Sequence, residues 1–177
     1  LNKPYGYTDW WPISMFFNCL VKPYDDPKVR WAICYAIDQQ TVVDVGYDGA
    51  GKPTFFFYPD YPGITQYYEG AKDLMAQYNV AEANQEKVDN LMGEAGFVRN
   101  ADNMWAYADG TEFKLERVAP VPLFADIGPV TVELMRQAGF DTTHVTPPDD
   151  WTQMSTGTAL LHFFGTGGSV IDPYYSL

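Results

Sequence analysis

The stretch PYDDPKVRWAICYAID, residues 23–38, decides the fold of this chain because it combines a turn, a helix start and a buried helix face. Asp26 precedes Pro27, and an Asp at this place accepts hydrogen bonds from the free amide groups of a first helical turn, where Pro is also well tolerated. The apolar residues that follow have the spacing of one helix face: Val29, Ala32, Ile33, Ala36 and Ile37. They predict an amphipathic helix that packs on a core.

The segments on either side of this helix extend the pattern. Before it, the apolar run 13–20 predicts a strand that leads to a turn at residues 22–24. After it, Asp38 is expected to cap a second short helix, which ends near Gly46 or Gly49. The first part of the chain therefore reads as a strand followed by two helices.

The middle of the chain begins with a stretch rich in Gly, Pro and aromatic residues. Residues 50–70 have this composition, which indicates a long structured loop. Loops of such length inside a compact domain are often functional. A short helix is expected over 71–78, and Asn79 is expected to cap a longer one over 80–95, which Gly96 stops.

The second half of the chain alternates between strands and helices. The dipeptide Asp109-Gly110 is the signal of a hairpin between residues 105–107 and 113–118. A clear helix over 125–138 ends at Gly139. The other expected elements are a turn at 100–103, a strand over 140–145, a short helix that begins at 149–151 and a strand over 159–164. This order predicts an α/β or α+β fold with some parallel strand pairing.

The composition excludes some classes of function. The chain has 11 Lys and Arg residues and 23 Asp and Glu residues, so its formal net charge is −12. This balance argues against nucleic-acid binding and against docking on an anionic membrane surface, since both need clustered cations. No apolar run approaches the roughly 20 residues of a membrane helix. Aromatic residues make up 16% of the 177 residues, which favours a protein that grips a ligand or a partner.

Patterns typical of catalytic and metal sites are missing from the sequence. His144 and His162 stand outside any metal-ligand motif, and no G-x-S-x-G motif is present. Paired carboxylates stand just before expected helices, where capping explains them better than catalysis does. Cys19 and Cys34 lie in apolar stretches and are expected to be buried free thiols. We therefore expect no catalytic residue, no metal and no organic cofactor.

The loop GTGGS, residues 165–169, directly follows the expected strand over 159–164. Glycines let a ligand approach the backbone closely, and in open α/β sheets ligands favour the carboxyl ends of strands. The loop has no Lys of the kind that phosphate-binding loops use. Two interpretations stay open, a loop that contacts a ligand and a tight turn between a strand and a helix.

Five segments of the chain, in order, carry a resemblance to one known family. Residues 23–38 are similar to its stretch PFDDVRVRQAISYAID, in which charge, turn and helix pattern coincide. Residues 86–97 are similar to EKAKKLLAEAGF, and residues 105–115 to the hairpin W…DG…L that follows it. Residues 132–140 resemble AELLQEQLKKAGI, and residues 168–177 contain the family's terminal Asp-Pro pair. The family is that of extracytoplasmic solute-binding proteins of ABC importers, typified by dipeptide- and oligopeptide-binding proteins (solute-binding family 5).

The resemblance implies a fold and a place of action. Family members have two lobes that close on a ligand. Residues 1–177 would then be one ligand-binding lobe, with a mixed sheet flanked by helices, excised from the later part of a longer two-lobed chain. The implied function is non-catalytic solute capture outside the cytoplasm, in the periplasm or anchored at the cell surface, with ABC permease subunits as partners. Two functions of other classes stay open, an enzyme of carbohydrate metabolism and a surface adhesion module.

The resemblance also assigns ligand contacts to the end of the strand over 159–164. In peptide-binding members, an Asp three residues before the Asp-Pro pair clamps the ammonium group of the peptide. Counting back from Asp172 gives the neutral Ser169. The missing clamp and the many rings favour an oligosaccharide, whereas the family as a whole favours an oligopeptide, so both ligand classes stay open. The residues predicted to bind the ligand are Phe164, Gly165, Thr166, Gly167, Gly168, Ser169 and Trp151.

Overall fold

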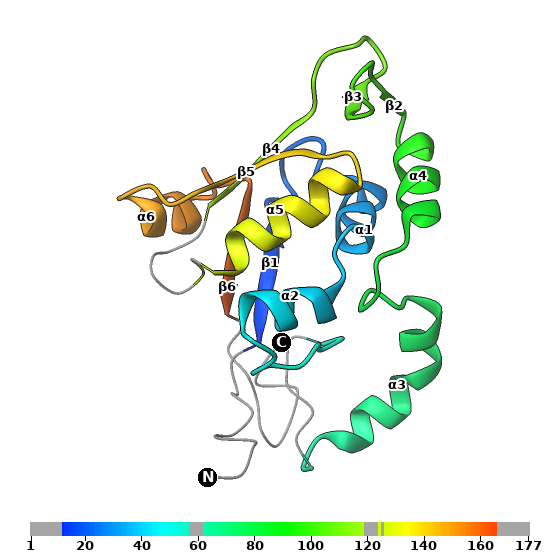
Figure 1. Ribbon diagram of the computed structural model, residues 1–177, viewed down its shortest axis with the longest axis vertical. Helices are drawn as coiled ribbons and strands as arrows, with labels where there is room; N and C mark the ends of the chain where they lie inside the picture. Colours follow the sequence, from blue (N-terminus) through cyan, green and yellow to red (C-terminus); the bar gives the residue numbers. More distant parts are fainter. Residues whose placement is uncertain (1–11, 57–61, 119–123, 125, 166–177) are drawn as a thin grey trace.

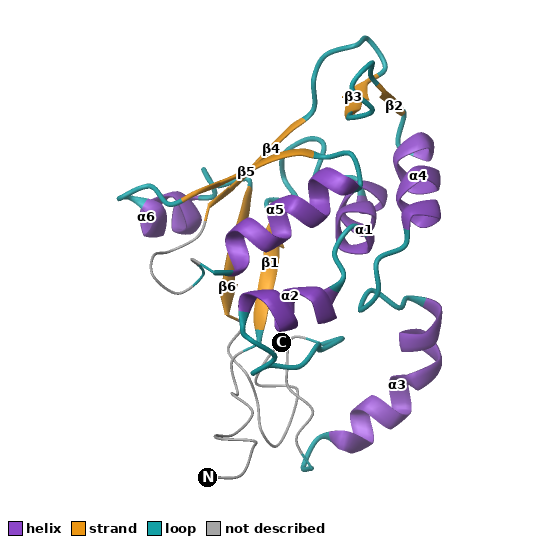
Figure 2. Ribbon diagram, in the orientation of Figure 1, coloured by secondary structure: helices purple, strands orange, loops and turns teal. Residues whose placement is uncertain are grey.

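The structure, a computed structural model, describes residues 12–56, 62–118, 124 and 126–165. Its helices and strands alternate along the chain (Figure 1, Figure 2). In chain order they are β1 (Ile13–Phe17), α1 (Pro27–Tyr35), α2 (Gln39–Gly46), α3 (Thr65–Gln77), α4 (Gln85–Glu94), β2 (Phe97–Arg99), β3 (Trp105–Tyr107), β4 (Lys114–Val118), α5 (Ile127–Gln137), β5 (Asp141–Val145), α6 (Asp150–Thr156) and β6 (Leu161–Gly165). Across these described ranges, no helix has both the length and the apolar character needed to span a membrane.

The main sheet has four strands in the order β1-β6-β4-β5. Strand β4 is parallel to both β5 and β6, whereas β1 runs antiparallel to β6. Ile13 pairs with Gly165 and Phe17 pairs with Leu161, so the first described strand lies against the last one. The predicted α/β fold, with a mixed sheet, parallel pairing and flanking helices, is confirmed.

Helix α1 has the cap and the buried face that its sequence predicts. Asp26 Oδ1 accepts a hydrogen bond from the amide of Lys28 at 2.8 Å, and Pro27 is the first helical residue. The whole predicted face is buried: Val29, Ala32, Ile33, Ala36 and Ile37. It shares the main core with Val88 and Met92 of α4, which lies beside α1 in Figure 1. The helix therefore anchors the fold by burial of one apolar face.

Helix α2 begins where the sequence predicts, because Asp38 Oδ1 accepts hydrogen bonds from the amide and the hydroxyl of Thr41, each at 2.7 Å. It ends at Gly46, which lies so close to α5 that a Cβ there would be 2.8 Å from Ile127 Cγ2. Helix α5 packs in turn on β5, and Figure 1 shows it lying across the main sheet. Gly139, two residues after the last residue of α5, has a φ of 90° and stops the helix as predicted.

The structure corrects the start of the helix that was expected over 80–95. Helix α4 begins only after Asn84, which is its cap and accepts a hydrogen bond from the amide of Lys87 at 2.9 Å. Asn79 instead accepts a hydrogen bond from the amide of Ala81 at 3.1 Å. Such a bond to the amide two residues on closes a local turn that competes with a helix. The prediction that Asn79 caps this helix is therefore wrong.

Two more boundaries differ from the expected ones. The helix expected over 71–78 begins at Thr65 as α3, so part of the expected long loop is helical. The residue that precedes it, Ile64, makes no capping hydrogen bond with its side chain, so the sequence carries no start signal there. Strand β3 pairs with β2 rather than with β4, and only a single bridge joins Ala106 to Glu112. The expected hairpin is thus limited to that bridge, because β4 belongs to the main sheet.

The two cysteines differ in exposure. Cys19 is exposed in the turn after β1, so the prediction that it is a buried thiol is wrong. Cys34 is half-buried on α1, and burial raises the pKa of its thiol to about 11. A thiol with such a pKa stays protonated, and therefore unreactive, at neutral pH.

Candidate functional site

Three parallel strands run toward the same end of the main sheet. Val118 and Val145, the last residues of β4 and β5, are in register, and Val118 also pairs with His162 of β6. Strand β6 continues from that pairing as far as Gly165. We call this end of β4, β5 and β6 the carboxyl edge. Ligands of α/β sheets bind beyond the carboxyl ends of the strands, so this edge is the candidate ligand face.

Helix α6 places an exposed tryptophan against the end of β6. The helix begins at Asp150, whose Oδ1 accepts a hydrogen bond from the amide of Trp151 at 2.6 Å, and the left-handed Gly157 follows its last residue. The ring of Trp151 meets that of Phe164 with centroids 5.0 Å apart and planes at 79°. Trp151 is 57% exposed and Phe164 is half-buried. The indole therefore keeps much of its surface for a ligand while Phe164 fixes its position.

Three of the seven residues predicted to bind the ligand lie in the described ranges, and the structure brings them together. Phe164 and Gly165 end β6, and Gly165 is buried and paired with Ile13. Trp151 reaches Phe164 from α6. The other four predicted residues lie outside the described ranges, and their role stays a prediction: Thr166, Gly167, Gly168 and Ser169.

The face of the sheet that Trp151 contacts carries two further rings. Side chains alternate along a strand, so His162 and Phe164 share one face, with Phe16 and Ser14 of β1 opposite them. The rings of His162 and Phe16 stack with centroids 5.2 Å apart and planes at 11°. Burial lowers the pKa of His162, which keeps its ring neutral at neutral pH. We call the surface formed by Phe16, His162, Phe164 and Trp151 the α6 face.

Sequence reasoning missed half of this surface. The sequence predicts only that Phe16 lies in a strand, and it offers His162 only as a possible metal ligand. The signal that finds His162 is its position two residues before Phe164 in one strand, which places both rings on the same side. No local signal connects Phe16 to them, because β1 and β6 come from opposite ends of the described chain.

The opposite face of the sheet holds a buried cation under α5. Arg117 has no exposed surface, and its guanidinium donates to the hydroxyl of Thr131 and, at 3.1 Å, to the carbonyl of Gly128. It also lies 5.0 Å from the centre of the Phe163 ring. Among the residues that the structure describes, no carboxylate forms an ion pair with Arg117, and its Nε has no hydrogen-bond partner. Burial lowers the pKa of Arg117 to about 10.

His144 lies beside this cation. It is paired with Arg117 across β4 and β5, and its ring packs so closely on Gly128 that a Cβ there would be 2.5 Å from His144 Nε2. Both ring nitrogens are buried and lack a hydrogen-bond partner within the described ranges. Burial first, and then the positive charge of Arg117, lower the pKa of His144. We call the surface formed by Arg117, His144, Phe163 and the contacting residues of α5 the α5 face.

The arrangement of histidines does not bring metal ligands together. His144 pairs with Arg117 and His162 pairs with Val118, and neighbouring residues of β4 point to opposite faces of the sheet. Within the described part of the chain, no three His, Cys, Asp or Glu side chains gather closely enough to hold a metal ion. The described site is therefore a surface of neutral rings and backbone.

Residues 2–177 match the family described as bacterial extracellular solute-binding proteins, family 5 Middle. The chain belongs to this family. The resemblance first seen in residues 23–38 is thereby confirmed. The two solved structures described next are those of oligopeptide-binding proteins, and they share the fold of this chain.

Two solved structures and one curated protein illustrate the relationship. The periplasmic oligopeptide-binding protein TM1223 of Thermotoga maritima, bound to mannohexaose, has a TM-score of 0.79 at 20% identity and covers 95% of this chain. The oligopeptide-binding protein AppA of Bacillus subtilis, in complex with a nonapeptide, has a TM-score of 0.65 at 20% identity over 95% of this chain. Heme-binding protein A of Haemophilus influenzae is 32% identical over 81 residues, or 46% of this chain.

This chain is much shorter than these relatives. It spans 32% of the Thermotoga protein, 33% of the Bacillus protein and 13% of the Haemophilus protein. The Thermotoga structure contains mannohexaose, the Bacillus structure contains a nonapeptide, and the Haemophilus protein is named for binding heme. Solute binding is therefore the general role of the family. Structures with this fold hold solutes as different as a hexasaccharide and a nonapeptide.

Proposed function

We propose that this chain is one ligand-binding lobe of a solute-binding protein that captures an oligopeptide, or a similarly extended solute, in a cleft between two lobes. The captured solute is then delivered to the permease subunits of an ABC importer. The protein acts outside the cytoplasm, in the periplasm or anchored at the cell surface. The family match supports solute capture over the enzymatic and adhesive alternatives. A solute that contacts both lobes biases the hinge between them toward the closed form.

One observation supports the proposed position of the solute at the carboxyl edge. The exposed ring of Trp151 stands edge-on to Phe164 at the carboxyl edge, next to the buried backbone of Gly165. An exposed indole supplies a large apolar surface with few rotatable bonds, which suits a binding site. The adjoining residues 166–169 extend the proposed contact surface by their sequence, since three of the first four residues from Gly165 onward are glycines.

An oligosaccharide is the alternative solute. Ser169 stands where the resemblance places the Asp clamp of a peptide-binding member, so this position supplies no carboxylate for a peptide ammonium group. The aromatic surface formed by Trp151 and Phe164 suits sugar rings, whose C–H faces pack on aromatic rings. The mannohexaose found in the Thermotoga structure gives this alternative a precedent in the fold.

A thermal-shift screen of the full-length protein against peptide and oligosaccharide panels tests the proposal. A solute that binds the native state raises the melting temperature by mass action. Peptides of several residues are expected to raise it, and a rise with oligosaccharides alone favours the alternative. The absence of a shift with every member of both panels contradicts the proposal.

Ser169→Asp separates the two solute classes. The new carboxylate is expected to weaken binding of a neutral sugar, because an unpaired charge in a closing cleft carries a desolvation cost. It is expected to strengthen binding of a peptide with a free amino terminus through a charge-assisted contact. Asn90→Asp, at an exposed position of α4, is the control with the same change in charge. Equal effects of the two variants would move the ammonium position away from residue 169.

A further inference from the structure

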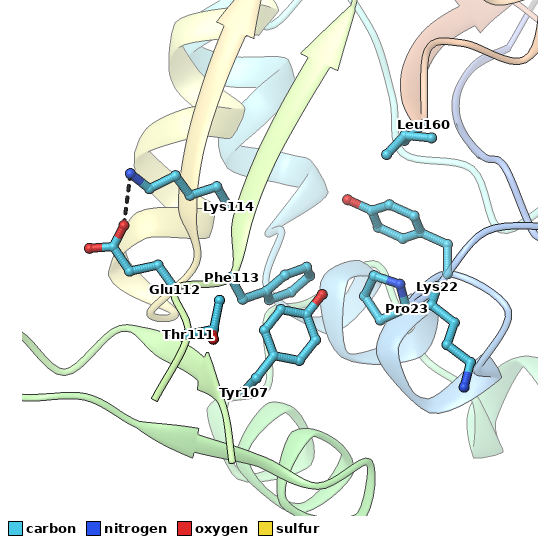
Figure 3. Close-up of a pocket in the computed structure, with 9 residues that line it drawn as sticks. Lys22, Pro23, Tyr107, Thr111, Glu112, Phe113, Lys114 and Leu160 are labelled. Atoms are coloured by element: carbon cyan, nitrogen blue, oxygen red, sulfur yellow. Dashed lines mark ion pairs between the residues drawn. The ribbon is translucent and has the colours of Figure 1, made fainter. Parts of the chain in front are cut away.

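A cavity lies at the other end of the main sheet, where β4 and β6 begin. Three segments that are far apart in the sequence form it: the turn 22–24, residues from Tyr107 at the end of β3 to Lys114 at the start of β4, and Leu160 before β6. Its volume is about 470 Å³, which lies in the range of small-molecule sites. We call it the amino-edge pocket (Figure 3). It is separate from the carboxyl edge, and its role does not depend on the proposed function.

Two tyrosines line this pocket with hydroxyl groups that no described residue uses. Tyr24 is 2% exposed and packs its ring on Phe17, with centroids 5.8 Å apart. Tyr107 is half-buried and packs on Phe97 and Phe113, with centroids at 5.0 Å and 5.8 Å. Neither hydroxyl has a hydrogen-bond partner in the described structure. Burial raises the pKa of both phenols, so both stay O–H donors at neutral pH.

The backbone holds the Tyr107 side of the pocket in a tight turn. The amide of Tyr107 donates to the carbonyl of Thr111, and the amide of Gly110 donates to the carbonyl of Tyr107, each at 2.9 Å. Asp109 Oδ1 accepts a hydrogen bond from the amide of Thr111 at 2.9 Å. Gly110 has a φ of 87°, which other residues rarely adopt. The position of the Tyr107 ring is thus fixed by the fold rather than by a ligand.

The charged residues around the pocket point away from its interior. Lys114 and Glu112 form an ion pair of 2.8 Å, and Figure 3 shows both side chains turned away from Phe113 and Tyr107. The ammonium end of Lys22 also points away from Leu160. The interior therefore combines apolar walls, from residues such as Pro23, with the two phenol donors.

We propose that the amino-edge pocket binds a second, small ligand: an uncharged, ring-sized molecule whose carbonyl oxygen accepts hydrogen bonds from Tyr24 and Tyr107. The apolar walls suit a ring, and the two O–H groups suit one acceptor. A sugar ring brings more hydroxyl groups than two phenols can satisfy, and buried unpaired hydroxyls cost free energy. An anion is excluded as the ligand, because the lining residues Lys22 and Lys114 point away from the interior (Figure 3) and the chain has a net charge of −12.

A matched pair of probes tests the proposal in the full-length protein by fluorine NMR. 4-Fluoroacetophenone carries the carbonyl acceptor, and 1-ethyl-4-fluorobenzene has the same ring and shape without it. The ketone is expected to bind at least about fivefold more tightly, as one net hydrogen bond predicts. Tyr24→Phe and Tyr107→Phe remove a hydroxyl and keep the ring, so each lowers this preference and the double variant abolishes it.

Tyr78→Phe is the control, because Tyr78 follows α3, is 43% exposed, stacks on Trp31 and is not among the residues that line the pocket. It leaves the preference for the ketone unchanged. Equal binding of the two probes by the wild type, or no binding of either, overturns the proposal. So does a double variant that keeps the full preference. If Tyr24→Phe does not fold, the half-buried Tyr107 provides the same test alone.

Discussion

The two faces of the main sheet are made by alternate residues of the same strands, yet they differ in almost every physical respect. On β6, Phe163 is 5% exposed and packs under α5 against Phe124 and the guanidinium of Arg117. The next residue, Phe164, is half-buried and meets the exposed ring of Trp151. The α5 face is thus a closed packing layer, whereas the α6 face presents rings to solvent.

This difference shows how a rigid element can position a binding surface without burying it. Side chains along a strand alternate, so a residue fixed in the core determines where its neighbours on the other face point. The α5 face holds β6 in place through Phe163, and the α6 face takes its geometry from that anchor. Variants of the α5 face should therefore change stability, and variants of the α6 face should change binding.

The largest expected effect comes from the neighbouring pair on β6. Phe163→Ala is expected to lower the free energy of unfolding by about 3–5 kcal/mol, because it leaves a cavity beside Phe124 and removes the ring under Arg117. Phe164→Ala is expected to lower it by only about 1 kcal/mol, since the ring is half-buried. Urea denaturation of both variants measures the difference. Equal losses would mean that the two faces are not distinct layers.

The contact between α5 and β5 is the next test of the closed layer. Gly128→Ala would place a methyl group 2.5 Å from His144 Nε2, and such overpacking is expected to cost about 1–3 kcal/mol of stability. Gly93→Ala in α4 is the matched control, because a Cβ there meets no atom within 4 Å. This control is expected to stabilise the protein by about 0.5–1 kcal/mol through helix propensity. A thermal melt that shows stabilisation by both variants would contradict the close packing of α5.

A smaller effect is expected from pH. Burial lowers the folded-state pKa of both His144 and His162, while in the unfolded chain a histidine titrates near about 6.5. The unfolded state therefore binds more protons below that pH, so stability is full above it and is lost as the pH falls through the lower folded pKa values. Urea midpoints at pH 7.5 and pH 5 measure this loss. In the double variant His144→Asn/His162→Asn, the loss is expected to be smaller, and an unchanged loss would assign it to other groups.

The smallest expected effect concerns the buried cation. Arg117→Met replaces an unpaired guanidinium by an apolar side chain of similar length, and such replacements of buried charge are neutral or stabilising. The free energy of unfolding is expected to change by about 1 kcal/mol or less, or to rise. Lys114→Met, at an exposed position of the same strand, is the control. A loss of about 3 kcal/mol in Arg117→Met would show that its hydrogen bonds to α5 hold the layer together.

Elements with local signals were predictable from the sequence. The caps Asp26 and Asp38, the buried face of α1 and the stop at Gly139 all depend on residues within a few positions of one another. The same holds for the short helix at Trp151 and for strand β6, which contains Phe164 and ends at Gly165. Local signals therefore predicted the helix and the strand that carry Trp151 and Phe164, whereas their assignment as ligand contacts comes from the family resemblance and stays a prediction.

The other features of the fold and the site could not be predicted, because they depend on contacts between residues far apart in the sequence or on a choice between two similar local signals. Asn79 and Asn84 are equally good caps by residue type, and only the packing of α4 on α1 selects Asn84. The pairing of β1 with β6, which puts Phe16 on His162, joins opposite ends of the described chain. The burial of Arg117 is equally nonlocal, because an arginine is usually exposed and only α5 covers it here.

Calorimetric titration of the full-length protein with the solute found in the thermal-shift screen tests the central claim most directly. Trp151→Ala is expected to weaken binding by about 1–3 kcal/mol, the usual range for loss of a large aromatic contact. Trp31→Ala, which removes a 38% exposed ring from α1, is expected to leave the affinity unchanged. A Trp151→Ala protein that binds as tightly as the wild type would contradict the claim that the carboxyl edge is the solute-binding surface.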